Sequence, residues 1–348
     1  MRNFMILFLA SVFLALLLQG IGMPIPYLLA PLLLTVFCNV KGYKFKWQIK
    51  WRNLALIPIG YGLGRQIEWA TCQKIFNELC GIGASTFFLT TISVIMAVII
   101  SRKTKIAIES SLIGNMPGGL TQMLLLSEEL SGVDANVVTI MQTVRLVSTI
   151  VVIPFIVLNS LSSTHDFHSL IKDNVSNFLS LPDAVFMIAT VLVGVFLARL
   201  IKIPTPYMLG ALLITAGLNI VWQPVPEIDR TILKVAQIFV GIQMGQAVEL
   251  PKIKELRQHL PIIISSSVVV IIASFGLGYL LRFYYGYDLA TAFLATAPGG
   301  ITEMSITGLN IGADVSIILA YQLFRLIFMS ALMPVLLKGY FNYRHTTA

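Results

Sequence analysis

Hydrophobic residues gather in long runs along the chain, and short polar segments separate these runs. A helix needs roughly 20 apolar residues to cross the hydrocarbon core of a bilayer. Runs of about this length predict ten membrane-spanning helices, near residues 4–21, 25–40, 53–70, 83–101, 134–160, 182–201, 204–222, 231–249, 259–281 and 316–337.

Two further apolar segments each contain a Pro-Gly-Gly triplet, at about 106–128 and 288–309. The first reads NMPGGLTQM (115–123) and the second TAPGGITEM (296–304). Proline lacks a backbone donor and glycine has little helical preference, so we expect each helix to open at its proline. Each segment is therefore predicted to be a re-entrant hairpin or a broken crossing helix.

The chain is a tandem duplication. MPIPYLLAPLLLTVFCN (23–39) matches IPTPYMLGALLITAGLN (203–219) at an offset of 180 residues, and the two Pro-Gly-Gly triplets match at an offset of 181. Repeated structural units are the simplest source of such self-similarity. We predict a first membrane repeat over 1–161, an interfacial linker over 162–181 and a second membrane repeat over 182–348.

Basic residues in short loops indicate that the two repeats are inverted. In the first half they concentrate at 41–52 and 102–105, whereas in the second half they concentrate at 199–202 and 252–257, which are counterparts of the other loops. Basic loops stay on the cytoplasmic side. Equivalent loops of the two halves are therefore expected on opposite sides of the membrane. The predicted fold is an all-α polytopic membrane protein of two inverted repeats, each with five transmembrane helices plus one Pro-Gly-Gly re-entrant or broken helix. Both termini are expected in the cytoplasm.

Composition agrees with this class. The chain is 57% hydrophobic and 11% charged, whereas soluble domains carry roughly 25% charged residues. The net charge of +8 arises largely from the loops, and no basic nucleic-acid-binding module is visible, so we expect no nucleic-acid partner. Cys72 and Cys80 could form a disulfide or remain free thiols, and both alternatives stay open.

The two Pro-Gly-Gly breaks are the candidate binding site. Open backbone survives in a membrane only where protein buries it or where it lines a wet cavity. Inverted repeats would bring the two breaks together near the bilayer midplane, and the following half-helices, with Thr121 and Thr302 as candidate caps, would favour an anion. The alternative is a kink or tight turn without a ligand.

Glu303 is the one carboxylate in either motif, and its counterpart is the amide Gln122. A buried carboxylate can exchange protons near neutral pH, so Glu303 is a candidate coupling site for H⁺ or Na⁺. A static ion pair with an arginine is the alternative. Among the acids, only Glu303 and Glu109 are expected within the membrane.

Arg145 and Arg325 lie about eleven residues into their predicted helices, roughly 16 Å from the end at 1.5 Å per residue, so each needs a partner inside the protein. Gln142 and Gln322 precede them by three residues and share their helix faces. The arginines would either bind a substrate carboxylate or phosphate, or clamp the carbonyls of the Pro-Gly-Gly loops. The predicted substrate and ion site comprises Pro117, Gly118, Gly119, Thr121, Gln122, Gln142, Arg145, Pro298, Gly299, Gly300, Thr302, Glu303, Gln322 and Arg325.

Other small and polar residues are expected to pack helices together. Close helix contact is predicted for the glycines Gly60, Gly62, Gly64, Gly241 and Gly245. Interhelical hydrogen bonds are predicted for Asn39, Asn219, Gln237, Gln243 and Gln246.

The duplicated half, with Pro-Gly-Gly followed by Thr and an amide or acid and by a downstream Gln-x-x-Arg, resembles the AbrB family of bacterial inner-membrane proteins over nearly the whole chain. The resemblance implies a bacterial inner-membrane location and a relation to the cation:proton antiporter and anion transporter superfamily. Members carry three kinds of label: ammonia monooxygenase, regulator of aidB expression and transporter.

The residues available as metal ligands bear on the monooxygenase label. A copper or iron monooxygenase needs several His or carboxylate ligands around a metal, whereas all four histidines, at 165, 168, 259 and 345, fall in linkers and tails. We therefore expect no enzyme, no metal and no cofactor. Regulation of transcription would be indirect, because no soluble segment exceeds about twenty residues.

The expected function is secondary transport of a small anionic or zwitterionic solute, coupled to an ion. A membrane sensor that affects gene expression indirectly is the alternative, and a membrane-bound monooxygenase is a third. The expected partners are the lipid bilayer, the solute, H⁺ or Na⁺, and a second copy of the chain in a homodimer.

Overall fold

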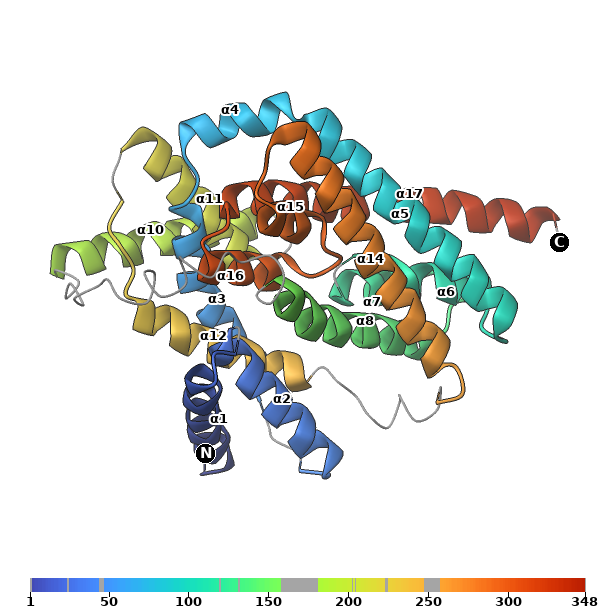
Figure 1. Ribbon diagram of the computed structural model, residues 1–348, viewed down its shortest axis with the longest axis horizontal. Helices are drawn as coiled ribbons and strands as arrows, with labels where there is room; N and C mark the ends of the chain where they lie inside the picture. The colour runs from blue at the N-terminus through green and yellow to red at the C-terminus, as the bar shows by residue number, and fades with distance from the viewer. Residues whose placement is uncertain are drawn as a thin grey trace. The chain divides into compact units, whose positions relative to one another are not determined.

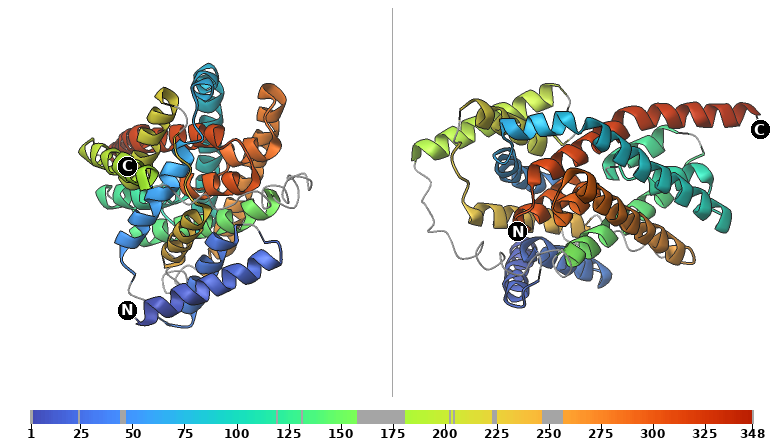
Figure 2. Two further views of the ribbon diagram at one scale, coloured as in Figure 1. Left: turned by 90° about the vertical axis from the view of Figure 1, so that its left-hand side faces the viewer. Right: turned by 45° about the horizontal axis from the view of Figure 1, so that its top comes forward.

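The computed structural model describes residues 2–23, 25–43, 47–118, 120–130, 132–157, 181–201, 203, 205–222, 225–246 and 257–347. Every regular element within these ranges is an α-helix (Figures 1 and 2). The chain divides into two compact units. Unit 1 takes residues 1–76, 162–248 and 309–316, and unit 2 takes residues 77–161, 249–308 and 317–348.

Unit 1 is built from two sets of three helices, one set from each half of the sequence. The first set is α1 (Arg2–Gly20), α2 (Pro26–Val40) and α3 (Ile49–Gly64), and the second is α10 (Leu181–Leu200), α11 (Pro206–Val221) and α12 (Arg230–Gln246). The helices of the two sets interleave, because α3 packs against α11 and α12 packs against α2.

Unit 2 repeats this plan with the remaining helices. The first half supplies α5 (Leu79–Lys103), α6 (Ile108–Asn115), α7 (Leu120–Glu129) and α8 (Ala135–Ile156). The second half supplies α14 (Leu260–Tyr285), α15 (Leu289–Thr296), α16 (Ile301–Ile311) and α17 (Val315–Thr347), of which α16 and α17 lie only partly in this unit. The helix α14 packs against α5 and α8, so unit 2 also joins the two halves.

Glycines make the contact between the halves in unit 1. A Cβ atom added at Gly60 of α3 would lie 2.3 Å from the carbonyl oxygen of Met208 in α11. One added at Gly241 of α12, the counterpart of Gly60, would lie 2.4 Å from the carbonyl oxygen of Leu28 in α2. Only a residue without a side chain permits such an approach, so the prediction of close helix packing at these glycines is confirmed.

Two asparagines form hydrogen bonds between the same pairs of helices. Asn39 of α2 donates to the main-chain oxygen of Gly245 at 3.1 Å. Its counterpart Asn219 of α11 donates to the main-chain oxygens of Arg65 and Ile67 at 3.0 and 3.1 Å. Both therefore satisfy carbonyls at the C-terminal end of a helix from the other half, as the sequence predicts.

Five helices are long and apolar enough to cross a membrane, namely those at Leu79–Lys103, Ala135–Ile156, Leu181–Leu200, Leu260–Tyr285 and Val315–Phe341. Shorter apolar helices cover Met5–Gly20, Pro26–Asn39 and Pro206–Val221. Each of the ten predicted runs coincides with a helix. The described part of the chain is therefore helical throughout and has the apolar helices of a membrane protein, while the number of crossings and the inverted relation of the repeats stay predictions.

Two local features differ from the predicted pattern. The helix α4 (Trp69–Asn77) lies where a loop was expected and contains no buried residue. The helix α17 continues about ten residues beyond the predicted end at 337. The three cysteines are free thiols.

The predicted linker at 162–181, including His165 and His168, lies outside the described residues except for its last residue.

Candidate functional site

Both Pro-Gly-Gly segments open as predicted, and both lie in unit 2. The helix α6 ends at Asn115 and α7 begins at Leu120, with Pro117 buried in the break. The helix α15 ends at Thr296 and α16 begins at Ile301, with Pro298 buried. The helical hydrogen-bond pattern is therefore interrupted at each break, and carbonyls beside the break need other partners.

Gln142 and Arg145 of α8 supply these partners at the first break. The side-chain amide of Gln142 donates to the main-chain oxygens of Ile113 and Met116 at 2.9 and 3.0 Å. The guanidinium of Arg145 donates to Met116 as well, and to the main-chain oxygen of Gly118 at 2.8 Å. One amide and one guanidinium thus hold the open end of α6.

Gln322 and Arg325 of α17 do the same at the second break. The amide of Gln322 donates to the main-chain oxygens of Leu294 and Ala297 at 2.9 and 3.2 Å. The guanidinium of Arg325 donates to Ala297 at 2.8 Å and to Gly299 at 2.8 Å. It also donates to the side-chain oxygen of Gln322, which fixes the two side chains against each other.

These contacts bear out the clamp interpretation of the arginines, and their binding of a substrate carboxylate or phosphate stays a prediction. Arg145 and Arg325 are 8% and 4% exposed. Their guanidinium groups donate hydrogen bonds to carbonyls of the Pro-Gly-Gly segments, so the clamp prediction is confirmed. A buried carbonyl without a donor costs about 1–3 kcal/mol, and each clamp removes this cost at several carbonyls.

Polar anchors just before each break were missed in the sequence. Asn115 donates to the main-chain oxygen of Ser93 in α5 at 2.7 Å, and its side-chain oxygen accepts from Ser266 of α14 at 2.7 Å. Its counterpart Thr296 donates to the main-chain oxygen of Ser274 in α14 at 2.8 Å. The signal was present, because Asn115 and Thr296 occupy equivalent positions in the two motifs.

A methionine covers the second residue of each triplet. A Cβ atom added at Gly118 would lie 2.5 Å from Cε of Met123, and one added at Gly299 would lie 2.5 Å from Cε of Met304. Both methionines are buried. A side chain at either glycine would therefore require the flexible end of the methionine to move.

Glu303 lies in the first turn of α16 and folds back over the break. A Cβ atom added at Gly300 would lie 1.8 Å from Oε2 of Glu303, so a side chain there would require this carboxyl group to move. Thr302 beside it is partly buried. An acid at the third position of a helix is favoured by the helix dipole.

The corresponding region of the first motif is only partly described. Gly119 and the side chains of Thr121 and Gln122 lie outside the described residues. Their predicted roles in the site therefore stay predictions.

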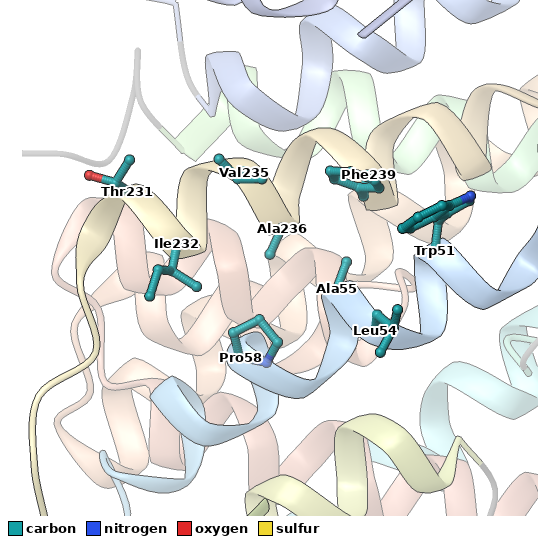
Figure 3. A pocket seen from close by; sticks show the side chains of 9 residues that line it. All are labelled: Trp51, Leu54, Ala55, Pro58, Thr231, Ile232, Val235, Ala236 and Phe239. Carbon is teal, nitrogen blue, oxygen red and sulfur yellow. The ribbon is translucent and has the colours of Figure 1, made fainter. Parts of the chain in front are cut away.

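An open apolar groove of about 370 Å³ lies elsewhere, in unit 1 between α3 and α12 (Figure 3). Trp51 and Phe239 lie at one end with ring centroids 6.0 Å apart, and Pro58 faces Ile232 nearer the other end. None of the predicted site residues lines this groove.

Comparison with known proteins finds a family and two relatives that resemble this chain. Residues 27–340 match the family described as "Transition state regulatory protein AbrB". The chain is 25% identical over 301 residues to YhjN of Bacillus subtilis (strain 168), covering 82% of this chain and 77% of that protein. It is 25% identical over 216 residues to a protein of Escherichia coli (strain K12) named as a regulator, AbrB, covering 61% of this chain. That second match spans 60% of the relative, less than two thirds of its length. The match to the family covers most of the chain, and the chain therefore belongs to the AbrB family.

Proposed function

We propose that this protein is a secondary transporter of the bacterial inner membrane, and that its substrate site is formed at the two Pro-Gly-Gly breaks. The observation that carries the proposal is the pair of equivalent, clamped helix breaks within one compact unit. Transporters with internal repeats commonly build their sites from interrupted helices of this kind.

The charges at the breaks favour an anionic or zwitterionic solute. Arg145 and Arg325 bind main-chain carbonyls and no carboxylate among the described residues, so their positive charges are not cancelled by an ion pair. The N-terminal ends of α7 and α16 add partial positive charge next to the breaks. Two cations and two helix ends would together attract a carboxylate or phosphate group.

Glu303 is the proposed coupling residue. Its carboxyl group lies against Gly300, directly at the second break, where binding of H⁺ or Na⁺ would change the charge that the substrate meets. The first motif has the neutral Gln122 at the equivalent position. Because Glu303 is the one carboxylate in the two motifs, transport of the solute would be coupled to one cation.

Uptake into proteoliposomes tests this function. Purified protein would be reconstituted and offered a panel of carboxylates, phosphates and amino acids under imposed proton or sodium gradients. We expect gradient-driven accumulation of at least one solute, and loss of the gradient dependence in Glu303→Gln. Gradient-driven flux in Glu303→Gln equal to that of the unaltered protein would refute the coupling role.

A sensor without flux is the second candidate, because one relative is named as a regulator. Such a protein would bind its ligand at the same breaks and accumulate nothing. Equilibrium binding in detergent, measured beside uptake with the same solutes, separates the two functions: saturable binding without accumulation in any gradient would favour the sensor.

A further inference from the structure

The groove in unit 1 lies between two helices that the duplication makes equivalent. The offset of 181 residues that aligns Gly60 with Gly241 also aligns α3 with α12, and Ala55 with Ala236. Both alanines are buried and line the groove. Because their side chains are the smallest among the lining residues, they form the floor of the groove.

Larger apolar side chains form the two rims of the groove and stay exposed. Trp51 and Leu54 of α3 stand on one side, and Ile232 and Val235 of α12 stand on the other. None of the lining residues carries a charge. The volume of about 370 Å³ lies within the range of ligand pockets, roughly 300–1,000 Å³. Apolar walls above a floor of small residues suit a hydrocarbon chain.

The two ends of the groove differ, although the helices that form it are counterparts. Trp51 lies beside Phe239 at one end and Pro58 faces Ile232 nearer the other, so the helices run past each other in opposite directions (Figure 3). By the duplication, Trp51 corresponds to Ile232 and Phe239 to Pro58. The aromatic rings therefore gather at one end only. Tryptophan is enriched where membrane proteins meet lipid headgroups.

The aromatic end is also the basic end. Lys50 precedes Trp51 in the first turn of α3, is exposed and forms no ion pair within the described part of the chain. Arg52 follows Trp51. Both basic residues belong to the segment 41–52, which is expected on the cytoplasmic side. A negatively charged group at this end of the groove would therefore meet positive charge.

The opposite end carries a carboxylate. Asp229 accepts a hydrogen bond from the main-chain amide of Thr231 at 2.5 Å, and Thr231 lines the groove. A negative group placed at this end would be repelled by Asp229. A ligand with one anionic end is therefore favoured in a single orientation, with its charge beside Trp51.

We propose that this groove binds an anionic phospholipid, with an acyl chain between α3 and α12 and its phosphate beside Lys50. Basic residues near the membrane surface attract the anionic lipids of the cytoplasmic leaflet. From Trp51 to Pro58 the helix α3 rises by about 10 Å, so the groove holds the part of the acyl chain nearest the headgroup. The Trp51 ring lies between the phosphate and the chain.

A second copy of the chain is the competing occupant of this groove. The chain has 24 basic and 16 acidic residues, so a second copy would bring a net positive charge toward Lys50. An anionic lipid brings negative charge to the same place. Charge complementarity therefore favours the lipid.

Photolabelling of the full-length protein in nanodiscs of zwitterionic phosphatidylcholine tests the proposal. A trace of phosphatidylglycerol or of phosphatidylcholine, each with the same diazirine-bearing acyl chain, would be added, and labelled peptides would be identified by mass spectrometry. We expect phosphatidylglycerol to label residues 51–58 and 231–239 about fivefold more than phosphatidylcholine does, the effect of one basic residue at a membrane surface. Equal labelling by the two lipids would overturn the proposal, because the groove would then face bulk lipid only.

Lys50→Gln removes the exposed charge and should remove most of this preference. The matched control is Lys105→Gln, because Lys105 is an exposed lysine of the other basic segment in the first half. This control should keep the full preference for phosphatidylglycerol. A preference that survives in Lys50→Gln, or that both variants lose equally, would contradict the placement of the phosphate.

Val235→Trp tests the apolar part of the site. A larger ring at this exposed rim position fills the groove, so labelling of residues 51–58 should fall for both lipids. Leu213→Trp enlarges an exposed side chain of α11 outside the groove and should leave the labelling unchanged. The oligomeric state of both variants would be measured in the same nanodiscs. A dimer that Val235→Trp disrupts, with lipid labelling unaltered, would assign the groove to a second copy and overturn the proposal.

Discussion

The guanidinium of Arg325 donates a hydrogen bond to the main-chain oxygen of Gly299 across 2.8 Å. Arg145 makes the equivalent bond to Gly118, also at 2.8 Å. In each half an arginine from the following long helix thus holds a glycine within the break. The open backbone of both motifs is a fixed part of the fold, because its carbonyls have partners inside the protein.

Loss of a clamp should destabilise unit 2. In Arg325→Ala, the carbonyls of Ala297 and Gly299 lose their charged donor, and unmet buried carbonyls cost about 1–3 kcal/mol each. We expect a loss of about 3 kcal/mol, measured by thermal unfolding in detergent. Arg325→Lys should lose less, since an ammonium group can reach one carbonyl but lacks the planar fork.

Arg282 offers a matched control at the exposed end of α14. Arg282→Ala removes a guanidinium without emptying a buried clamp, and surface changes of this kind usually alter stability by less than about 0.5 kcal/mol. Equal unfolding midpoints for Arg325→Ala and Arg282→Ala would contradict the clamp.

Glycine substitutions should separate close helix contacts from open positions. Gly241→Ala places a Cβ atom 2.4 Å from the carbonyl oxygen of Leu28, so α12 and α2 must move apart. Overpacking costs typically about 1–3 kcal/mol. Gly217→Ala in α11 meets nothing within 4 Å, and should be neutral or stabilise by up to about 1 kcal/mol through helix propensity. Thermal unfolding of both variants checks the difference, which would be absent if α12 did not contact α2.

Exchanging the two anchors should show that they are equivalent. Asn115→Thr introduces the residue that stands at the same place in the second motif, and a threonine there can still donate to the carbonyl of Ser93. Asn115→Leu removes every hydrogen bond of this side chain. We expect Asn115→Leu to be the less stable variant by about 1–2 kcal/mol. An equal loss in both variants would show that the bond to Ser93 contributes nothing.

The monooxygenase alternative has its own test. Elemental analysis of protein purified in neutral buffer without chelator should show copper, iron and zinc well below one atom per chain. Such an enzyme needs a metal held by several histidine or carboxylate ligands. Stoichiometric metal that survives dialysis would revive this alternative and contradict the expectation drawn from the sequence.

Local chemistry could be read from the sequence because it depends on neighbouring residues. Pro117 and Pro298 cannot continue a helix, so both breaks were predictable. The depth of Arg145 in its apolar run required an internal partner, and the clamp was one of two stated possibilities. The Gly-rich stretch at Gly60 predicted close packing, although its partner Met208 was not identified.

Long-range pairing could not be read in this way. Nothing near Gly241 indicates that Leu28 lies against it, because that contact joins residues more than two hundred positions apart. The same limit hid the division into two units that each draw on both halves.

The account depends most on the inverted relation of the two halves, since only this would bring the breaks together from opposite sides of the bilayer. Single cysteines at positions 165 and 345, in a background without other cysteines, would be labelled with an impermeant thiol reagent in intact cells and in inverted vesicles. We predict that residue 165 reacts from the periplasmic side and residue 345 from the cytoplasmic side. Labelling of both residues from the same side would contradict the inverted repeat and the site proposed from it.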